Sequence, residues 1–213
     1  LEFRRVLFRS RVCDAVVMAA PSPVAARLLQ PVDAAVSEAI GSIVYHSVAI
    51  AALGFRNVPP APRAADWGSR GFGFVIPRGE GRQTIACTWV HNKFSYRAPQ
   101  GAALVRSFFG GARNEAVDAV SDAAVLDAAR SELAGIMGLQ AAPDFARVYR
   151  WSKCMPQYGV GHLDMLERLD ARLAALPGLE LAGNGFRGVG IPDCVQSARQ
   201  AAGRIGELLA TGR

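Results

Sequence analysis

Hydrophobic residues follow two different patterns along the chain. Near both ends, short apolar runs are followed by segments with helical spacing, whereas in the middle the apolar runs are separated by Gly and Pro. Near the start, Val12–Ala20 is closed by Pro21 and predicts a buried parallel strand. Ser22 is a candidate cap for the helix that follows, with Pro23 in its first turn. Near the end, Leu179–Ala182 predicts a strand and Pro192–Leu209 the last helix.

The middle of the chain has the pattern of an antiparallel sheet. Pro and Ala fill the predicted loop Val58–Ala65, and Gly and Pro interrupt strand-like pieces: Ile43–Phe55, Gly73–Ile76, Thr84–Val90, Ala103–Phe109 and Ala146–Trp151. Two helices are predicted, Ser121–Leu139 with Ser121 or Asp122 as its cap, and His162–Leu176 ended by Pro177 and Gly178. The end pieces therefore bracket a β-rich middle, which indicates two interleaved domains.

Composition and charge narrow the class of protein. The chain has 213 residues, 51% of them hydrophobic and 20% charged, which is typical of a globular protein. Its net charge is +6, but no Lys/Arg block interleaves with aromatic residues, so we expect no nucleic-acid binding. The longest apolar run, Ala39–Phe55, contains His46 and many β-branched residues, which favours a buried strand over a membrane span.

No set of side chains with the spacing of a metal or acid–base site stands out. The four cysteines form no CxxC pair, which argues against zinc ribbons and redox dithiols and indicates a reducing interior. The histidines, His46, His91 and His162, lack metal-ligand spacing, and no Ser/His/Asp set is evident.

The first ten residues, LEFRRVLFRS, are basic and patternless and run directly into the first predicted strand. We interpret residues 1–11 as a non-native scar and leave them out of the fold. Without Glu2, Arg4, Arg5 and Arg9 the net charge falls from +6 to +4. A basic arm for a membrane surface is the weaker alternative, because the segment is so short.

A Gly-rich turn near the end carries the clearest candidate chemistry. Residues 183–188 fit G-x-G-x-x-G between a predicted strand and a helix, but only 25 residues follow, too few for a second strand with a ribose-binding acid. Gly183, Gly185, Gly188 and Gly190 would let the backbone approach a ligand, and the helix N-terminus would favour an electron-rich group. A flavin suits such a turn, although a turn without any ligand stays open.

Five segments together resemble the flavin-dependent porphyrinogen oxidases of haem biosynthesis, the protoporphyrinogen and coproporphyrinogen III oxidases. Residues 181–202, LAGNGFRGVGIPDCVQSARQAA, are similar to the family's carboxy-terminal flavin motif. The other segments follow in family order and spacing: GFGFVIP at 71–77, CTWVHNKFSYRAP at 87–99, LVRSFFGG at 104–111 and WSKCMPQYGVGH at 151–162. The resemblance spans nearly all of residues 12–213.

The resemblance implies a mixed α/β (α+β) fold like that of monoamine oxidases. We expect an incomplete FAD-binding domain from residues 12–30 and 177–213, and a mostly antiparallel substrate-binding domain with helices from residues 31–176. The family's amino-terminal Rossmann unit does not occur in this sequence, so the resemblance implies a carboxy-terminal fragment. Such a fragment is expected to hold FAD weakly and to be inactive alone.

The resemblance also assigns roles to single residues. Five positions are expected to contact the flavin, namely Trp151, Asn184, Val189, Gly190 and Ile191. Five are expected on the substrate side, namely Phe72, Gly73, Val75, Phe108 and Phe109, although neighbouring residues of a strand cannot both face one slot. Core positions remain the alternative for Trp151 and for each Phe. No catalytic residue is predicted, Asp193 is expected to cap the last helix, and His162 to have a structural role.

The implied reaction removes six electrons from a porphyrinogen and gives the porphyrin. FAD would accept them in three steps, with O2 as the final acceptor and hydrogen peroxide as its product. The resemblance implies a cytoplasmic enzyme and leaves peripheral membrane contact and a homodimer open. Two alternatives remain: another amine-oxidase-like oxidase or desaturase, and a fragment that only holds a planar ligand.

Two further features bear on substrate and packing. Coproporphyrinogen keeps four propionates and would need cations at the slot mouth, for which Arg70, Arg97 and Arg106 are candidates. These residues do not decide between the two porphyrinogens. The family usually has glycine where this chain has Ala198, and the extra methyl group is expected to press on the neighbouring strand.

Overall fold

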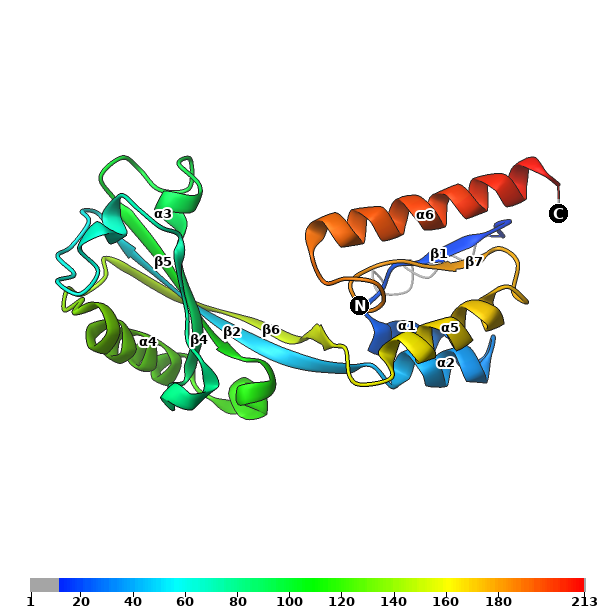
Figure 1. The fold of residues 1–213 in the computed structure, drawn as a ribbon, viewed down its shortest axis with the longest axis horizontal. Coiled ribbons are helices and arrows are strands. Elements are labelled where there is room, and N and C mark those ends of the chain that lie inside the picture. Colours follow the sequence, from blue (N-terminus) through cyan, green and yellow to red (C-terminus); the bar gives the residue numbers. More distant parts are fainter. Residues whose placement is uncertain (1–11, 213) are drawn as a thin grey trace, which may run out of the picture. The chain divides into compact units, whose positions relative to one another are not determined.

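The structure, a computed structural model, describes residues 12–212, so the predicted scar at residues 1–11 lies outside the described residues. The chain divides into two compact units (Figure 1). The terminal unit combines the described residues up to Val44 with those from Pro156 onward, and the middle unit is Tyr45–Met155. The terminal unit is thus built from both ends of the chain. The unit boundaries differ from the predicted domain boundaries after residues 30 and 176, since the helical segments 34–41 and 162–173, which fall within the predicted substrate domain, belong to the terminal unit.

The terminal unit is a two-stranded parallel sheet with helices. Strand β1 (Val16–Met18) pairs in parallel with β7 (Leu179–Leu181), so both predicted strands are found and the first is parallel as expected. The helices are α1 (Ser22–Leu29), α2 (Ala34–Gly41), α5 (His162–Leu173) and α6 (Ile191–Ala210). The expectation that β1 is buried is wrong for the described residues, because Val16 and Val17 are both more than 40% exposed.

Local hydrogen bonds explain where these helices begin. The carbonyl of Pro21 accepts from the amides of Val24 and Ala25, so Pro21 is the cap of α1 and Ser22, the predicted cap, is its first residue. Helix α2 is not predicted by the sequence pattern. Asp33 caps it by accepting from the amide of Val36 at 2.9 Å, and Val36 and Ile40 are buried one turn apart.

The middle unit is a five-stranded antiparallel sheet with one long helix. Its strands lie in the order β3-β4-β5-β2-β6, with bounds β2 Val44–Phe55, β3 Gly73–Val75, β4 Thr84–Trp89, β5 Ala103–Gly110 and β6 Phe145–Gln157. The predicted strands are thus confirmed, and β6 is longer than expected. A short helix, α3 (Val90–Lys93), follows β4, and 3-10 turns occupy Ala65–Gly68, Arg78–Glu80, Gly111–Arg113 and Glu115–Ala119.

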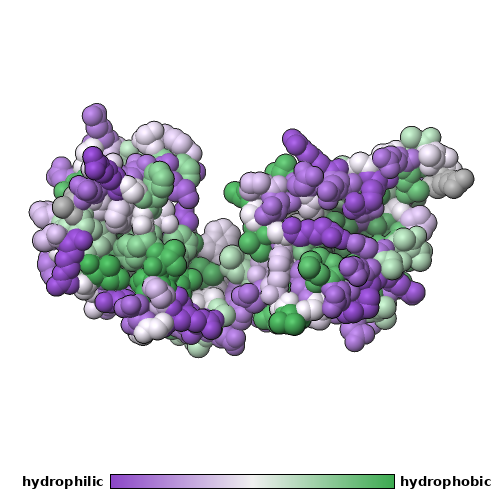
Figure 2. All heavy atoms as spheres, viewed as in Figure 1, coloured by the Kyte–Doolittle hydropathy of each residue, from purple (hydrophilic) through white to green (hydrophobic). Residues whose placement is uncertain are grey.

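Helix α4 (Asp122–Met137) covers one face of this sheet. Ser121 caps it by accepting from the amide of Ala124, and Asp122, the other candidate, is its first residue. Its buried residues recur every fourth position and meet the inward side chains of the strands in one core: Val125, Ala129, Leu133 and Met137 against Ala49, Ala51, Leu53, Cys87, Val105 and Phe109. Figure 2 shows hydrophobic side chains where α4 lies against β4 and hydrophilic ones over α6.

None of the helices in residues 12–212 is long and apolar enough to cross a membrane. In the same range, no three His, Cys, Asp or Glu side chains come together as metal ligands would. His91 instead bonds backbone groups: its Nε2 lies 3.1 Å from the carbonyl of Trp67, and its Nδ1 accepts from the amide of Leu104 at 3.2 Å. His46 lies 3.7 Å from Glu115.

Candidate functional site

The Gly-rich turn lies between β7 and α6 and has a backbone that only glycine adopts easily. Gly183 has a φ of 119° and Gly188 a φ of 138°. At Gly188 a Cβ atom would come within 2.4 Å of Cγ of Asp193. Gly190 is the cap residue of α6, and its amide donates to Oδ2 of Asp193 at 3.1 Å. Asp193 therefore takes part in capping the helix, as predicted, by holding the amide of the cap residue Gly190, and its position requires Gly188.

Two side chains of the PQYGVGH segment hold this turn in place. The hydroxyl of Tyr158 donates to the carbonyl of Asn184 at 2.7 Å and accepts from the amide of Gly188 at 2.9 Å. Nε2 of His162 lies 2.7 Å from the carbonyl of Phe186, so Nε2 carries the proton. The two rings stack with centroids 4.0 Å apart. His162 thus has the expected structural role, and the bracing by Tyr158 is one that sequence reasoning missed.

Four of the five predicted flavin contacts lie on this turn. Val189 and Ile191 are exposed, at 51% and 82%, and Gly190 and Asn184 are half-buried. Ile191 and Pro192 open α6, where first-turn amides point outward and the helix dipole is positive. An exposed backbone with two apolar side chains beside a helix N-terminus fits the flat, electron-rich edge of a flavin. The residues present therefore suit this cofactor.

Trp151, the fifth predicted contact, lies on β6 in the middle unit and is 56% exposed.

Strand β6 has an unusual backbone two residues after Trp151, because Lys153 has a φ of 45°. Oγ of Ser47 accepts from the amide of Lys153 at 3.0 Å and donates to Asp118 at 2.5 Å. The hydrogen bond from Ser47 is the main reason that the pKa of the Asp118 carboxyl is lowered.

Three predicted substrate-side residues share the face of the sheet opposite α4. Strand register places Val75, Ala86 and Phe108 in one row, and Gly73, Thr88 and Arg106 in the next. Val75 is 78% exposed and Phe108 half-buried. We call this surface the open face of the sheet. At Gly73 a Cβ atom would meet the carbonyl oxygen of Cys87 at 1.9 Å, so only glycine allows this strand pairing.

The other two predicted substrate-side residues lie elsewhere. Phe109 points into the core beneath α4 and is 3% exposed, because successive strand residues alternate between faces. It therefore takes the core alternative. Phe72 precedes β3 and is 63% exposed, and its carbonyl accepts from the amide of Trp89.

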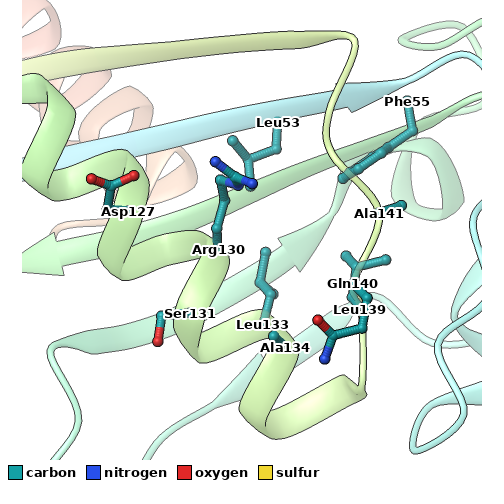
Figure 3. Close-up of a pocket in the computed structure, with 10 residues that line it drawn as sticks. All are labelled: Leu53, Phe55, Asp127, Arg130, Ser131, Leu133, Ala134, Leu139, Gln140 and Ala141. Carbon is teal, nitrogen blue, oxygen red and sulfur yellow. The ribbon is translucent and has the colours of Figure 1, made fainter.

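Two hollows are lined by residues outside the open face. One, of about 240 Å³, lies between α4 and the end of β2, with Leu53, Phe55 and Leu133 at its apolar side and Arg130 and Asp127 near one end (Figure 3). It belongs to the face that α4 covers. The other, of about 620 Å³, lies in the terminal unit between α5, β7 and α6. The pairs Arg187–Asp170 and Arg204–Glu180 are among the residues around it.

The structure separates the three candidate arginines. The guanidinium of Arg97 lies over the rings of Phe94 and Tyr96, at 5.8 and 5.4 Å from their centroids. Arg70 is exposed next to the 3-10 turn Ala65–Gly68. Of the three, Arg106 alone lies in the two rows of the open face, with its guanidinium 5.2 Å from the ring centre of Phe108.

The expected packing problem at Ala198 does not occur in the described residues. Ala198 is exposed, whereas Ser197 and Ala201 are the buried residues of α6. Oγ of Ser197 accepts from the amide of Gly183 at 3.3 Å and so joins α6 to the turn.

Comparison with known proteins gives consistent matches. The sequence profile of the flavin-containing amine oxidoreductases matches residues 5–206. Coproporphyrinogen III oxidase of Bacillus subtilis is 35% identical over 189 residues, which cover 88% of this chain and 39% of that protein. The chloroplastic protoporphyrinogen oxidase of Nicotiana tabacum is 29% identical over 195 residues, covering 89% and 36%.

A solved structure from Exiguobacterium sp. 255-15, provisionally described as a protoporphyrinogen oxidase, superposes with a TM-score of 0.75 at 30% identity. The match covers 93% of this chain and 42% of that one. Cyclohexylamine oxidase of Brevibacterium oxydans, at 17% identity and a TM-score of 0.63, shares the fold. The chain thus spans about two fifths of the length of the proteins it matches.

Proposed function

This chain belongs to the flavin-containing amine oxidoreductase family, and from that premise we propose that it forms part of an FAD-dependent porphyrinogen oxidase of haem biosynthesis. The reaction would convert protoporphyrinogen IX or coproporphyrinogen III to the porphyrin, with O2 as the acceptor. The main support is that relatives named for both activities match over 88% and 89% of this chain. The match to the family profile, over residues 5–206, includes both the turn and the open face.

The turn between β7 and α6 would hold the cofactor. When bound, FAD supplies the oxidation of the substrate and the transfer of electrons to O2. Asn184, Val189, Gly190 and Ile191 would contact it, mainly through backbone, and the positive end of α6 would stabilise the negative charge that a flavin gains on reduction. Tyr158 and His162 would keep the turn in the required shape.

The open face of the sheet would hold the macrocycle. Val75 and Phe108 offer apolar surface, Gly73 lets the ligand approach the backbone, and Phe72 directly precedes Gly73 in sequence. Burying this surface against a tetrapyrrole would also exclude water from the reacting carbons. We propose no acid–base residue for this chain.

The test is expression of the complete gene product that contains these residues. We expect yellow protein with a flavin spectrum that turns freshly reduced porphyrinogen into fluorescent porphyrin, with oxygen consumption and hydrogen peroxide release. Assays with both porphyrinogens decide the preferred substrate. Colourless protein that leaves both porphyrinogens unoxidised above the rate in buffer would contradict the proposal.

A further inference from the structure

Arg106 is a cation in an uncharged part of the open face. Its cross-strand neighbours are Thr88 on β4 and Ala52 on β2. The next row along the strands consists of Ala86, Phe108 and Ile50. No acidic side chain occupies these positions, so the sheet itself gives Arg106 no counter-ion.

The hydrogen-bonding groups of Arg106 also lack partners among residues 12–212. Within that range its Nε–H group is buried and donates to no acceptor, and no ion pair involves its guanidinium. Other arginines of the chain do have such partners: Arg150 bonds Asp122, Arg172 bonds Asp33 and Arg204 bonds Glu180. Because Nε is enclosed while the residue as a whole is only half-buried, a ligand on the open face would meet the two terminal nitrogens of the guanidinium, and an acceptor there would be favourable.

The position of the guanidinium is fixed without using its N–H groups. It lies over the ring of Phe108, 5.2 Å from the centroid, and a cation–π contact of this kind uses none of the N–H groups on the edge of the guanidinium as hydrogen-bond donors. That edge suits a carboxylate, which can accept two parallel hydrogen bonds from one guanidinium. Phosphate groups would also fit the edge, but the apolar surface beside it favours a ligand with an apolar body.

We propose that Arg106 binds a carboxylate side chain of the ligand that lies on the open face. Because the ligand body rests on Val75 and Phe108, the ligand class is an apolar ring system with acidic side chains, and this identification rests on the proposed function. In a porphyrinogen the carboxylate is a propionate. Arg106 is therefore a binding and specificity residue that acts on substrate affinity rather than on the oxidation step.

The experiment compares the complete wild-type gene product with Arg106→Gln and Arg106→Lys. Steady-state rates are measured with coproporphyrinogen III, and competition with coproporphyrin III and its tetramethyl ester reports the carboxylate contribution directly. Arg78→Gln is the matched control, because Arg78 is an exposed arginine in the 3-10 turn after β3 and its loss removes the same charge. Flavin content and melting temperature are recorded for every variant.

We expect Arg106→Gln to raise the KM roughly ten-fold or more at nearly unchanged kcat, since a charge-assisted hydrogen bond is lost in both ground and transition states. Arg106→Lys should recover part of this loss, and the preference for the free acid over the ester should shrink in Arg106→Gln only. Arg78→Gln should behave as wild type.

Two results would overturn the inference while leaving the proposed function intact. One is wild-type KM and wild-type preference for the free acid in a folded, active Arg106→Gln. The other is a lowered melting temperature with unchanged KM in both Arg106 variants, which would show that Arg106 pairs with another part of the protein. If the wild type oxidises no porphyrinogen, the proposed function fails instead, and binding of coproporphyrin III against its ester, followed by fluorescence, still tests Arg106.

Discussion

At the scale of single residues, the buried Cys87 is the most strongly perturbed titratable group among the described residues. Burial raises the pKa of its thiol to about 12, from an ordinary value near 9. The thiol should stay neutral and unreactive in the folded protein, whereas exposed Cys13 reacts. Because the folded pKa is the higher one, the free energy of unfolding is unaffected by this thiol below about pH 9 and falls as pH rises from 9 toward 12, where the thiol ionises more readily in the unfolded chain.

Thiol labelling at pH 8, read by mass spectrometry after digestion, checks this. Cys13 should be labelled within minutes and Cys87 only on the timescale of unfolding. Labelling in denaturant gives the matched control, in which both react. Equal labelling rates for Cys13 and Cys87 in native buffer would contradict the expected burial.

Tyr158 contributes a single hydroxyl that fixes the shape of the turn. In Tyr158→Phe the carbonyl of Asn184 and the amide of Gly188 both lose a partner, while the stacking on His162 is kept. We expect a loss of about 1 kcal/mol in stability and clearly weaker flavin retention. The ratio of flavin to protein absorbance after gel filtration measures the second effect. Tyr149→Phe, at an exposed position on β6, is the control and should retain flavin as wild type does.

At the scale of elements, alanine substitutions of two glycines, one in the turn and one inside α6, should have opposite effects on stability. In Gly188→Ala the new methyl group would overlap Asp193, at a φ of 138°, and we expect α6 to lose its cap and the turn its proposed contact with the flavin. Gly203 lies inside α6, and a Cβ atom added there would meet no atom within 4 Å, so Gly203→Ala should stabilise the helix by about 0.5–1 kcal/mol. Chemical denaturation and flavin content distinguish the two. Similar behaviour of both variants would contradict the structure of the turn.

The start of α2 should respond to acid. Asp33 accepts from the amide of Val36 and from Arg172 of α5, and the bond to Val36 is the main reason that the pKa of its carboxyl is lowered. A lowered pKa stabilises the fold above the ordinary value near 3.8, and this contribution is lost as pH falls through the folded pKa. In Asp33→Asn the side chain can still accept a hydrogen bond at the start of α2 but carries no charge. The melting temperature of this variant should therefore fall less than that of wild type between pH 6 and pH 3. An equal fall would exclude this role for Asp33.

At the scale of the whole molecule, the sequence predicts what depends on neighbouring residues and misses what depends on distant ones. The cap Asp193 and the alternation of Phe108 and Phe109 follow from local spacing, and both are found. The bracing of the turn by Tyr158 joins residues 26 positions apart, and no local pattern reports it. Likewise, the isolation of Arg106 depends on which side chains the neighbouring strands place around it.

A core substitution in one unit should destabilise mainly that unit. The large core between α4 and strands β2, β4 and β5 lies entirely within the middle unit, whereas Leu166 is buried in the terminal unit. Leu133→Ala should cost about 2–5 kcal/mol and raise amide hydrogen exchange mainly in the middle unit, because the lost contacts belong to that core. Leu166→Ala is the matched variant and should act mainly on the terminal unit. Exchange measured by mass spectrometry resolves the peptides of each unit, and a uniform rise across residues 12–212 in both variants would show a single cooperative unit instead.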